Sequence, residues 1–287
     1  MSVKVATWNV NRSLGNEYEG LIFNGLEQLN ADVVVLSEAF STDDFTPDNL
    51  KDDVLSRVNS FADKMDYDFI GHMPYQESGW RSPKEARTGE QTYLMVFGRE
   101  VIKSTNLLRL YNRNAYELDI VDIQTGINIQ GIATHFDDRY EYFRQKMMID
   151  LMSNLDPRPD RPNLLLGDFN AMPGKTREAQ LLRTKAARFI ADHSFTERMA
   201  IITNRSIEMA NGSIMRKLSD IGFRDADQFQ HSTYKLGKIS YGQLDHIMIA
   251  KSNIRSNSFE INNFPGSDHK AISAIIHIDL PKEQQLV

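Results

Sequence analysis

The sequence predicts an α/β protein built from layers of strands and helices. Three short apolar runs, at residues 33–36, 93–97 and 164–166, have the length of buried strands. Segments with helical spacing of apolar residues alternate with these runs, as they do in layered α/β folds. The chain has 287 residues, of which 41% are hydrophobic, so it can bury a substantial core.

Helices are predicted where apolar residues recur every three or four positions. The first covers residues 17–30, the second begins near Pro47 and Asp48, and the third covers residues 139–155. Two more are predicted at residues 176–195 and 214–221. The expected buried residues are Leu21, Ile22, Gly25, Leu26 and Leu29 in the first helix, Leu50, Val54, Val58 and Phe61 in the second, and Phe143, Met147, Met148, Leu151 and Met152 in the third.

Strands are predicted in the other apolar and β-branched segments. They cover residues 3–8, 67–72, 102–110, 116–123, 127–134, 243–250, 254–261 and 271–278. Residues 74–90 are polar and are interrupted by Gly79, Pro83 and Gly89, which predicts a long loop. Length alone allows one large domain or two small ones. Because no repeat or linker divides the chain, we expect a single domain over residues 1–287.

The composition excludes several kinds of site. The chain has no cysteine, so disulfide bonds, thiolate metal sites and a cysteine nucleophile are ruled out. It shows no signal peptide and no apolar run near the ~18 residues of a membrane span, so we expect a soluble, cytoplasmic protein. The net charge of −6 argues against a largely basic surface, but acidic metal ligands contribute to it, so a nucleic-acid enzyme remains possible. The oligomeric state is not indicated.

The most informative stretch is residues 163–170, Asn-Leu-Leu-Leu-Gly-Asp-Phe-Asn. Gly167 lets the backbone turn where the apolar run ends. Asp168 and Asn170 then share a face, because alternate residues of an extended chain do so. A carboxylate that can take a proton or bind a metal therefore lies beside an amide that can donate hydrogen bonds. The alternative interpretation is an ordinary Asx-rich turn.

Polar side chains also lie at or near the ends of the other strands. Besides Asp168 and Asn170, they are Asn9, Asn11, Glu38, His135, Asp245, Asp268 and His269. In layered α/β folds such ends converge on one rim, where sites are built. Several carboxylates in one place require a cation, and oxygen ligands without sulfur favour Mg²⁺ or Mn²⁺ over zinc.

Together these segments resemble the motifs of the endonuclease/exonuclease/phosphatase superfamily. In the family's order, they are Trp8-Asn9-Val10-Asn11, Glu38, Thr134-His135, Gly167-Asp168-Phe169-Asn170, Leu244-Asp245-His246 and Ser267-Asp268-His269. The resemblance implies a four-layer α/β/β/α sandwich, in which two packed mixed β-sheets are flanked by helices. It also implies a hydrolase that cleaves phosphoester bonds with a divalent metal.

By this resemblance, four residues line the metal site. Glu38 matches the acidic ligand, and Asn9, Asn11 and Asp268 line the same cation site. In-line attack on a phosphodiester concentrates negative charge on the phosphorus oxygens, which a cation stabilises. Mg²⁺ or Mn²⁺ is therefore the expected cofactor.

Five other residues match the family's catalytic groups. Asp168 matches the residue that positions or deprotonates the attacking water, and Asn170 matches the amide that holds a phosphate oxygen. His269 and His135 match two histidines that face the phosphate, and Asp245 matches the carboxylate that orients His269. A neighbouring carboxylate favours the protonated imidazole, which suits His269 to stabilise negative charge.

The remaining histidines are interpreted as structural or surface residues. They are His72, His193, His231, His246 and His277. Because His246 directly follows Asp245 in a strand, it is expected to face the opposite side of the sheet.

The expected substrate is nucleic acid, either DNA or RNA. Residues 91–97 resemble a strand of pancreatic-type deoxyribonucleases, although Gln91 and Glu90 leave the acid that pairs with the first histidine there without a clear match. Residues 33–40 resemble the matching strand of bacterial sphingomyelinases. The alternative to a nuclease is therefore a phosphodiesterase or phosphatase for a lipid or small soluble phosphoester. The arginine motif of inositol-polyphosphate 5-phosphatases is absent. A non-catalytic binding protein is disfavoured, because no ligand position carries an incompatible residue.

The polar loop carries the residues expected to hold a long substrate. Trp80, Arg81, Lys84 and Arg87 combine an aromatic ring with basic groups, which suits a phosphate backbone with exposed bases. We expect the three basic side chains to bind flanking phosphates and Trp80 to stack on a base or sugar. The alternative is a solvated loop whose Trp80 packs against the body of the protein.

Overall fold

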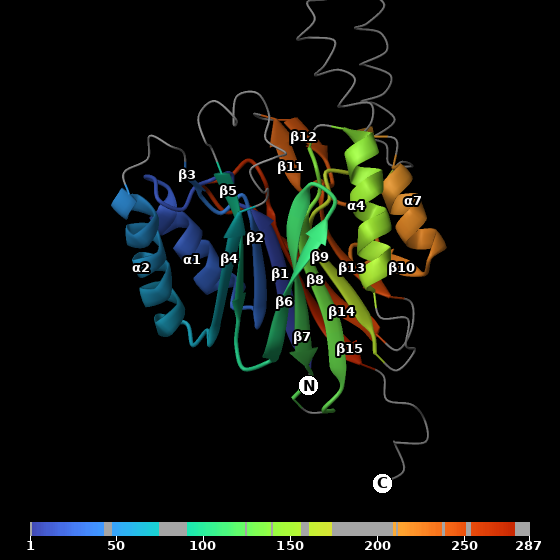
Figure 1. Cartoon of the computed structure of the whole chain (residues 1–287), viewed down its shortest axis with the longest axis horizontal. Helices are drawn as coiled ribbons and strands as arrows, with labels where there is room; N and C mark the ends of the chain where they lie inside the picture. Colours follow the sequence, from blue (N-terminus) through green and yellow to red (C-terminus); the bar gives the residue numbers. More distant parts are fainter. Residues whose placement is uncertain are drawn as a thin grey trace, which may run out of the picture.

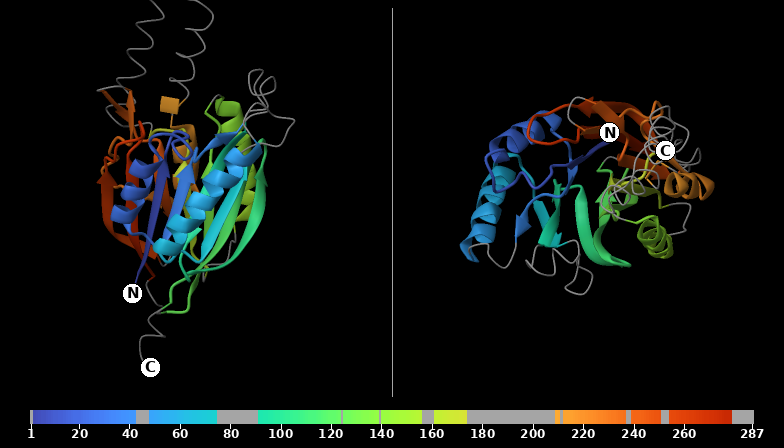
Figure 2. Two further views of the ribbon diagram at one scale, coloured as in Figure 1. Left: turned by 90° about the vertical axis from the view of Figure 1, so that its left-hand side faces the viewer. Right: turned by 90° about the horizontal axis from the view of Figure 1, so that it is seen from above.

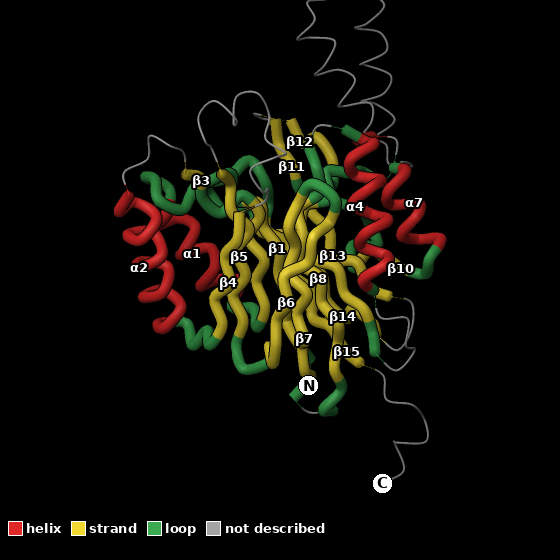
Figure 3. Tube along the Cα trace, in the orientation of Figure 1, coloured by secondary structure: helices red, strands yellow, loops and turns green. Residues whose placement is uncertain are grey.

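A computed structural model of the chain shows two mixed β-sheets packed face to face between two layers of helices (Figure 1). The structure describes residues 2–42, 48–74, 91–123, 125–138, 140–155, 161–173, 209–210, 212–236, 239–250 and 254–278. Helices α1 and α2 cover one sheet, and α4 and α7 cover the other (Figures 2 and 3). The predicted four-layer α/β/β/α sandwich is therefore confirmed.

The first sheet has seven strands in the order β14-β15-β1-β2-β5-β3, with β4 also paired to β5. Their bounds are β1 (Val3–Asn9), β2 (Val33–Ser37), β3 (Ser41–Thr42), β4 (Phe69–Pro74), β5 (Gln91–Gly98), β14 (Ile254–Asn262) and β15 (Ala271–Ile278). β1 and β2 run parallel, and the other pairs are antiparallel.

The second sheet has six strands in the order β10-β13-β9-β8-β7-β6. Their bounds are β6 (Ile102–Leu110), β7 (Arg113–Val121), β8 (Asn128–His135), β9 (Asn163–Asp168), β10 (Phe223–Asp225) and β13 (Asp245–Ala250). β8 and β9 run parallel, and the other pairs are antiparallel. A separate pair, β11 (Tyr234–Leu236) and β12 (Ile239–Gly242), lies at the upper end of the strands in Figure 1.

Each central strand contributes to two cores, because successive side chains point to opposite faces. In β2, Val33 and Val35 belong to the core between the two sheets. Val34 and Leu36 instead pack with residues of α1 and α2. This double burial explains why such strands appear in the sequence as continuous apolar runs.

The helices follow the predicted segments closely. Their bounds are α1 (Glu19–Leu29), α2 (Asp48–Lys64), α4 (Glu141–Asn154) and α7 (Ser213–Asp220). Val54, Val58 and Phe61 of α2 are buried, as predicted. No helix in the described part of the chain is both long and apolar enough to cross a membrane.

Two predicted buried residues lie at the edges of their helical stripes. Leu21 is 36% exposed and Met152 is 40% exposed, so predicting them as buried was wrong. The buried stripe of α1 begins one residue later, at Ile22, and that of α4 ends at Leu151.

Arg144 is fully buried on α4, where its Nε donates to Glu141 at 3.0 Å and its Nη1 donates to the Asp137 carbonyl at 3.0 Å.

The short strands β3, β10, β11 and β12 were not predicted from the sequence. They have two to four residues each, too few to show a periodic pattern. The predicted helix at 176–195 and almost all of the predicted loop at 74–90 lie outside the described residues.

Candidate active site

The site begins where the core between the sheets ends. Along β9, Leu164 and Leu166 face this core, so Asp168 emerges on the same face at the end of the strand. Asp168 is paired with His135 on the parallel strand β8 and with Asp245 on the antiparallel strand β13. Backbone register therefore places these three polar side chains side by side.

Gly167 is required for this arrangement. Its φ is +144°, and an added Cβ would lie 1.7 Å from the carbonyl oxygen of Thr134 on β8. No other residue type could adopt this conformation at so close an approach of two strands. The glycine before Asp168 thus determines how closely Asp168 lies to His135.

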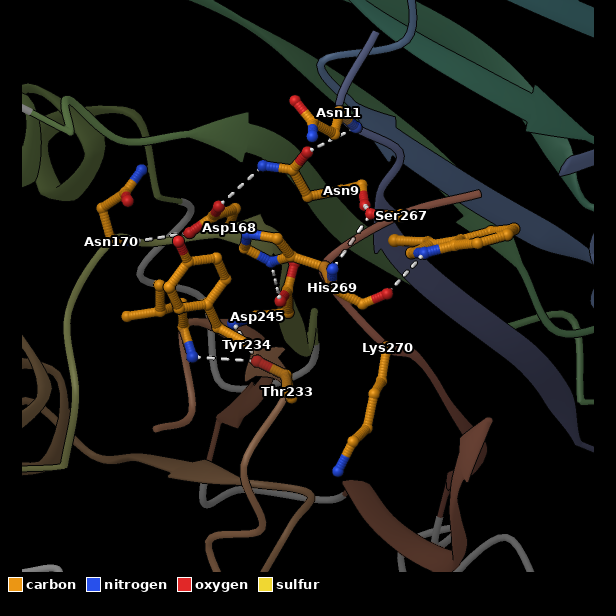
Figure 4. Close-up of polar contacts among 12 residues, drawn as sticks. Asn9, Asn11, Asp168, Asn170, Thr233, Tyr234, Asp245, Ser267, His269 and Lys270 are labelled. Atoms are coloured by element: carbon orange, nitrogen blue, oxygen red, sulfur yellow. Dashed lines mark hydrogen bonds and ion pairs between the residues drawn. The ribbon is translucent and has the colours of Figure 1, made fainter. Parts of the chain in front are cut away.

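The first sheet contributes Asn9, at the end of β1. Its Nδ2 donates to Asp168 Oδ2 at 3.0 Å (Figure 4). The same nitrogen lies 3.4 Å from Glu38 Oε1. Glu38 follows β2 with a φ of +48°, a conformation that is uncommon for this residue type. The Asn9 side chain therefore links the two sheets and the two carboxylates.

Asp245 and His269 form a buried pair. His269 Nδ1 lies 2.7 Å from Asp245 Oδ2 (Figure 4). Around it, the Ser267 hydroxyl accepts the His269 N–H at 3.0 Å, and Trp8 Nε1 donates to the His269 carbonyl at 3.1 Å. Burial opposes the charged imidazole, but the Asp245 carboxylate outweighs it and raises the pKa of His269 to about 10. His269 is therefore an imidazolium at neutral pH.

His135, unlike His269, is neutral at neutral pH. Burial, followed by the nearby Arg113 and His269, holds its pKa well below the usual value of 6.5. Its Nε2 lies 2.9 Å from the Asn170 amide nitrogen, which can only donate, so Nε2 carries no proton. The same amide nitrogen donates to the Phe136 carbonyl at 3.0 Å. Both N–H groups of the Asn170 side chain are thus engaged, and holding a phosphate oxygen would require one of them to change partner.

Asp168 lies between the two histidines. Burial, followed by repulsion from Asp245, raises its pKa to about 7, although His269 and the hydrogen bond from Asn9 oppose the shift. Its Oδ1 accepts the Asn170 backbone N–H at 2.8 Å, and its Oδ2 lies 3.8 Å from His135 Nε2. A carboxylate with this pKa can accept a proton near neutral pH.

A divalent cation fits the donor chemistry of this site. Ligand atoms of Asp168, Asp245 and His269 lie within 4.8 Å of one another. The Nδ1 of His269 is already bonded to Asp245, and an imidazolium cannot bind a metal, so this cluster is better described as an ion pair beside Asp168. The carboxylate of Glu38, beside Asn9, offers the hard oxygen ligands that Mg²⁺ prefers.

The structure brings most of the predicted site residues together. Those joined by direct contacts are Asn9, Glu38, His135, Asp168, Asn170, Asp245 and His269. Asn11 is exposed, and its backbone N–H donates to Asn9 Oδ1 at 3.0 Å. Asp268 is partly buried, and its charge favours protonated His269. The predicted substrate-binding residues Trp80, Arg81, Lys84 and Arg87 lie outside the described residues.

Three residues near the site were not predicted. Arg12 Nε lies 3.5 Å from Glu38 Oε2, and Arg113 lowers the pKa of His135. Tyr234 packs against His269 with ring centroids 4.8 Å apart. Arg12 directly follows the Asn9–Asn11 segment, which was a usable signal; Arg113 and Tyr234 lie far from the motifs in the sequence.

His246 faces away from the site, as expected from its position after Asp245. Its Nδ1 lies 2.6 Å from Asp225 Oδ2, and its Nε2 lies 2.9 Å from the Ala171 carbonyl. These contacts support a structural role on the outer face of β13.

Comparison with known proteins defines the class of this protein. A family model described as the endonuclease/exonuclease/phosphatase family matches residues 6–269. The chain therefore belongs to this family, whose members are hydrolases that act on phosphoester bonds. A comparison with curated protein sequences finds no significant match.

Solved structures show the same fold at low sequence identity. An endonuclease/exonuclease/phosphatase from Beutenbergia cavernae is 14% identical with a TM-score of 0.70, and the match covers 97% of this chain and 72% of that one. A mannosyl-6-phosphatase from Bacteroides thetaiotaomicron is 12% identical with a TM-score of 0.56, covering 96% and 100%. An AP endonuclease from Archaeoglobus fulgidus is 14% identical with a TM-score of 0.58, covering 97% and 100%. These similarities establish the fold and leave the substrate open.

Proposed function

We propose that this protein is a Mg²⁺- or Mn²⁺-dependent phosphodiesterase that cleaves nucleic acid, DNA or RNA. The observation that carries the proposal is the arrangement around Asp168. This buried carboxylate has a pKa of about 7 and lies beside an imidazolium, His269, that Asp245 holds in place. A proton acceptor next to a positive donor is what hydrolysis of a phosphodiester requires.

Each side chain has a specific task in this proposal. Asp168 accepts the proton of the attacking water, and Asn9 orients the carboxylate through its hydrogen bond at 3.0 Å. His269 donates from Nε2 to a phosphate oxygen, because its Nδ1 is committed to Asp245. His135, which is neutral, contacts Asn170 and lies beside Asp168.

The metal would be held by Glu38, with Asn9, Asn11 and Asp268 lining its site. When bound, it supplies Lewis-acid stabilisation of the charge that develops on the phosphate oxygens. In this structure, Arg12 Nε lies 3.5 Å from Oε2 of Glu38, the carboxylate proposed to hold the metal.

Two considerations favour nucleic acid as the substrate. The predicted loop residues Trp80, Arg81, Lys84 and Arg87 suit a polyanion with exposed bases. The similar structure from Archaeoglobus fulgidus is described as an AP endonuclease. The alternative is a lipid or small soluble phosphoester, and the similar mannosyl-6-phosphatase shows that the fold also serves phosphatases.

An activity screen decides between these substrates. Purified protein is incubated with single-stranded DNA, duplex DNA, RNA, sphingomyelin and a set of sugar phosphates, each with Mg²⁺, with Mn²⁺ and with a chelator. We expect metal-dependent cleavage of a nucleic acid to be the fastest reaction. Faster turnover of a lipid or sugar phosphate would replace the nuclease assignment with the alternative, and activity that survives chelation would remove the metal from the proposal.

The loop provides an independent test of the substrate class. The triple variant Arg81→Ala, Lys84→Ala, Arg87→Ala should weaken binding of long nucleic acids and reduce its salt dependence, because phosphate contacts release counterions. Cleavage of a small chromogenic phosphodiester should hardly change, and this serves as the internal control. Equal losses on both substrates, or no loss on either, would exclude the loop as a nucleic-acid contact.

A further inference from the structure

The small strand pair β11–β12 is joined to the loop that carries His269. The Lys235 N–H donates to the Asp268 carbonyl at 2.8 Å, and the Lys270 N–H donates to the Thr233 carbonyl at 2.7 Å. Tyr234 and His269 face each other across this antiparallel bridge, with their rings 4.8 Å apart. The backbone of Thr233 and its neighbours therefore fixes the position of His269 from one side.

The side chain of Thr233 reaches the other member of the pair. Its Oγ1 accepts the N–H of Leu244 at 3.0 Å and the N–H of Asp245 at 3.1 Å (Figure 4). Thr233 is fully buried, so neither N–H has water as an easy substitute. Successive N–H groups of a regular strand point to opposite edges, so one oxygen can accept both only where the backbone departs from regular geometry. The hydroxyl thus stabilises an irregular start of β13, at Asp245, whose carboxylate holds His269.

We propose that Thr233 is a positioning residue that sets Asp245 and His269 in register with each other. Its carbonyl binds the His269 loop through Lys270, and its hydroxyl binds the backbone of Asp245. Asp245 begins β13 of the second sheet, whereas His269 lies in the loop before β15 of the first sheet, and their contact of 2.7 Å depends on both backbones being held. Tyr234 adds to this by packing its ring against the imidazole.

The test compares two substitutions at Thr233. Thr233→Val keeps the shape and removes the oxygen, whereas Thr233→Ser keeps the oxygen and removes the methyl group. Thr7→Val is the matched control, because Thr7 is a buried strand residue whose Oγ1 has no hydrogen-bond partner among the described residues. All four proteins are assayed with Mg²⁺ on a small chromogenic phosphodiester, which needs no loop contacts. This part of the test rests on the proposed phosphodiesterase function.

We expect Thr233→Val to lower kcat by about 10²-fold, the scale of a misplaced catalytic group, with KM little changed. Thr233→Ser and Thr7→Val should stay near the wild-type value. A Thr233→Val protein that folds and keeps the wild-type kcat would overturn the proposal. Equal losses in Thr233→Ser and Thr233→Val would also overturn it, by showing that the methyl group rather than the oxygen matters.

Two NMR measurements on the metal-free protein do not depend on activity. The Nδ1–H proton of His269, in its short bond to Asp245, should give a far-downfield resonance that Thr233→Val broadens or shifts and Thr7→Val preserves. In the wild type, the amide protons of Leu244 and Asp245 should exchange with solvent as slowly as those within β13. Fast exchange of both amides would overturn the proposal even if Thr233→Val does not fold. If the wild type cleaves no phosphodiester, the proposed function fails, and these measurements still test the role of Thr233.

Discussion

His135 and His269 are both buried histidines near Asp168, yet the protein holds them in opposite charge states. Asp245 raises the pKa of His269 to about 10, whereas burial and Arg113 keep the pKa of His135 well below its usual value. The two residues experience similar desolvation, so their different partners decide the outcome. His269 lies 2.7 Å from the Asp245 carboxylate, and His135 lies 2.9 Å from the amide nitrogen of Asn170. The site therefore contains one positive donor and one neutral ring, rather than two equivalent histidines.

The largest expected effect follows from this asymmetry. His269→Ala should lower kcat by about 10³-fold, because it removes a positive charge from the transition state, and His135→Ala should cost about 10²-fold or less. Asp168→Asn should resemble His269→Ala, and the double variant should fall well short of the summed losses since both groups serve one transition state. Steady-state kinetics with circular dichroism as a fold check measures this. A larger loss for His135→Ala than for His269→Ala would contradict the comparison.

A substitution of Glu38 tests the proposed metal site independently of the two histidines. If Glu38 holds the metal as proposed, its loss should cost at least as much as loss of a residue that supports a ligand. Glu38→Gln should therefore lower activity by about 10²-fold at low metal concentration. Excess Mg²⁺ or Mn²⁺ should restore part of the activity. The matched control is Glu27→Gln, which should behave as the wild type. Glu27 lies on α1 and pairs with Lys64 of α2, away from the proposed metal site. Near-normal activity of Glu38→Gln at low metal would show that Glu38 is not a ligand.

Asp245→Asn removes the partner that distinguishes His269 from His135. Without the carboxylate, burial dominates, so the pKa of His269 should fall from about 10 toward the behaviour of His135. Turnover near neutral pH should fall by about 10–100-fold, because the ring becomes neutral. NMR titration of the metal-free variant measures the shift. If the pKa of His269 stayed near 10, Asp245 would not be its cause.

The fold could be predicted because its central strands are buried on both faces. Runs such as residues 33–36 and 164–166 are apolar throughout, and this pattern survives without any knowledge of tertiary contacts. β11 and β12 gave no such signal, because strands of three and four residues have no periodicity to detect. Thr233 was missed for the same reason, since its role depends on Asp245, twelve residues later.

The sequence could place the candidate site residues at strand ends, but it could not give their charge states. Asp168 and His135 lie at strand ends, which the apolar runs reveal. The low pKa of His135 depends first on burial and then on Arg113, which precedes it in the chain and is brought beside it by the pairing of β7 with β8. Burial and long-range pairing decide such shifts, and neither is written in local sequence.

The smallest expected effect is on stability, where the two histidines should act at opposite ends of the pH scale. The folded-state pKa of His135 is depressed, so its contribution to stability is present above the unfolded value of about 6.5 and is lost as the pH falls toward the folded value. The pKa of His269 is raised, so its contribution is present below about 6.5 and is lost as the pH rises through about 10.

Substitution of either histidine should therefore flatten one side of the stability profile only. The free energy of unfolding of the metal-free protein, measured with urea between about pH 5 and pH 9, should change by at most about 1.4 kcal/mol per pH unit for each group. His135→Gln should reduce the loss on the acid side, and His269→Gln should reduce the loss on the alkaline side. Each variant is the control for the other, because both remove one buried imidazole from the same site. Identical profiles of unfolding free energy against pH for the two variants would contradict this prediction. Two histidines that titrate in the same way cannot affect opposite sides of the profile.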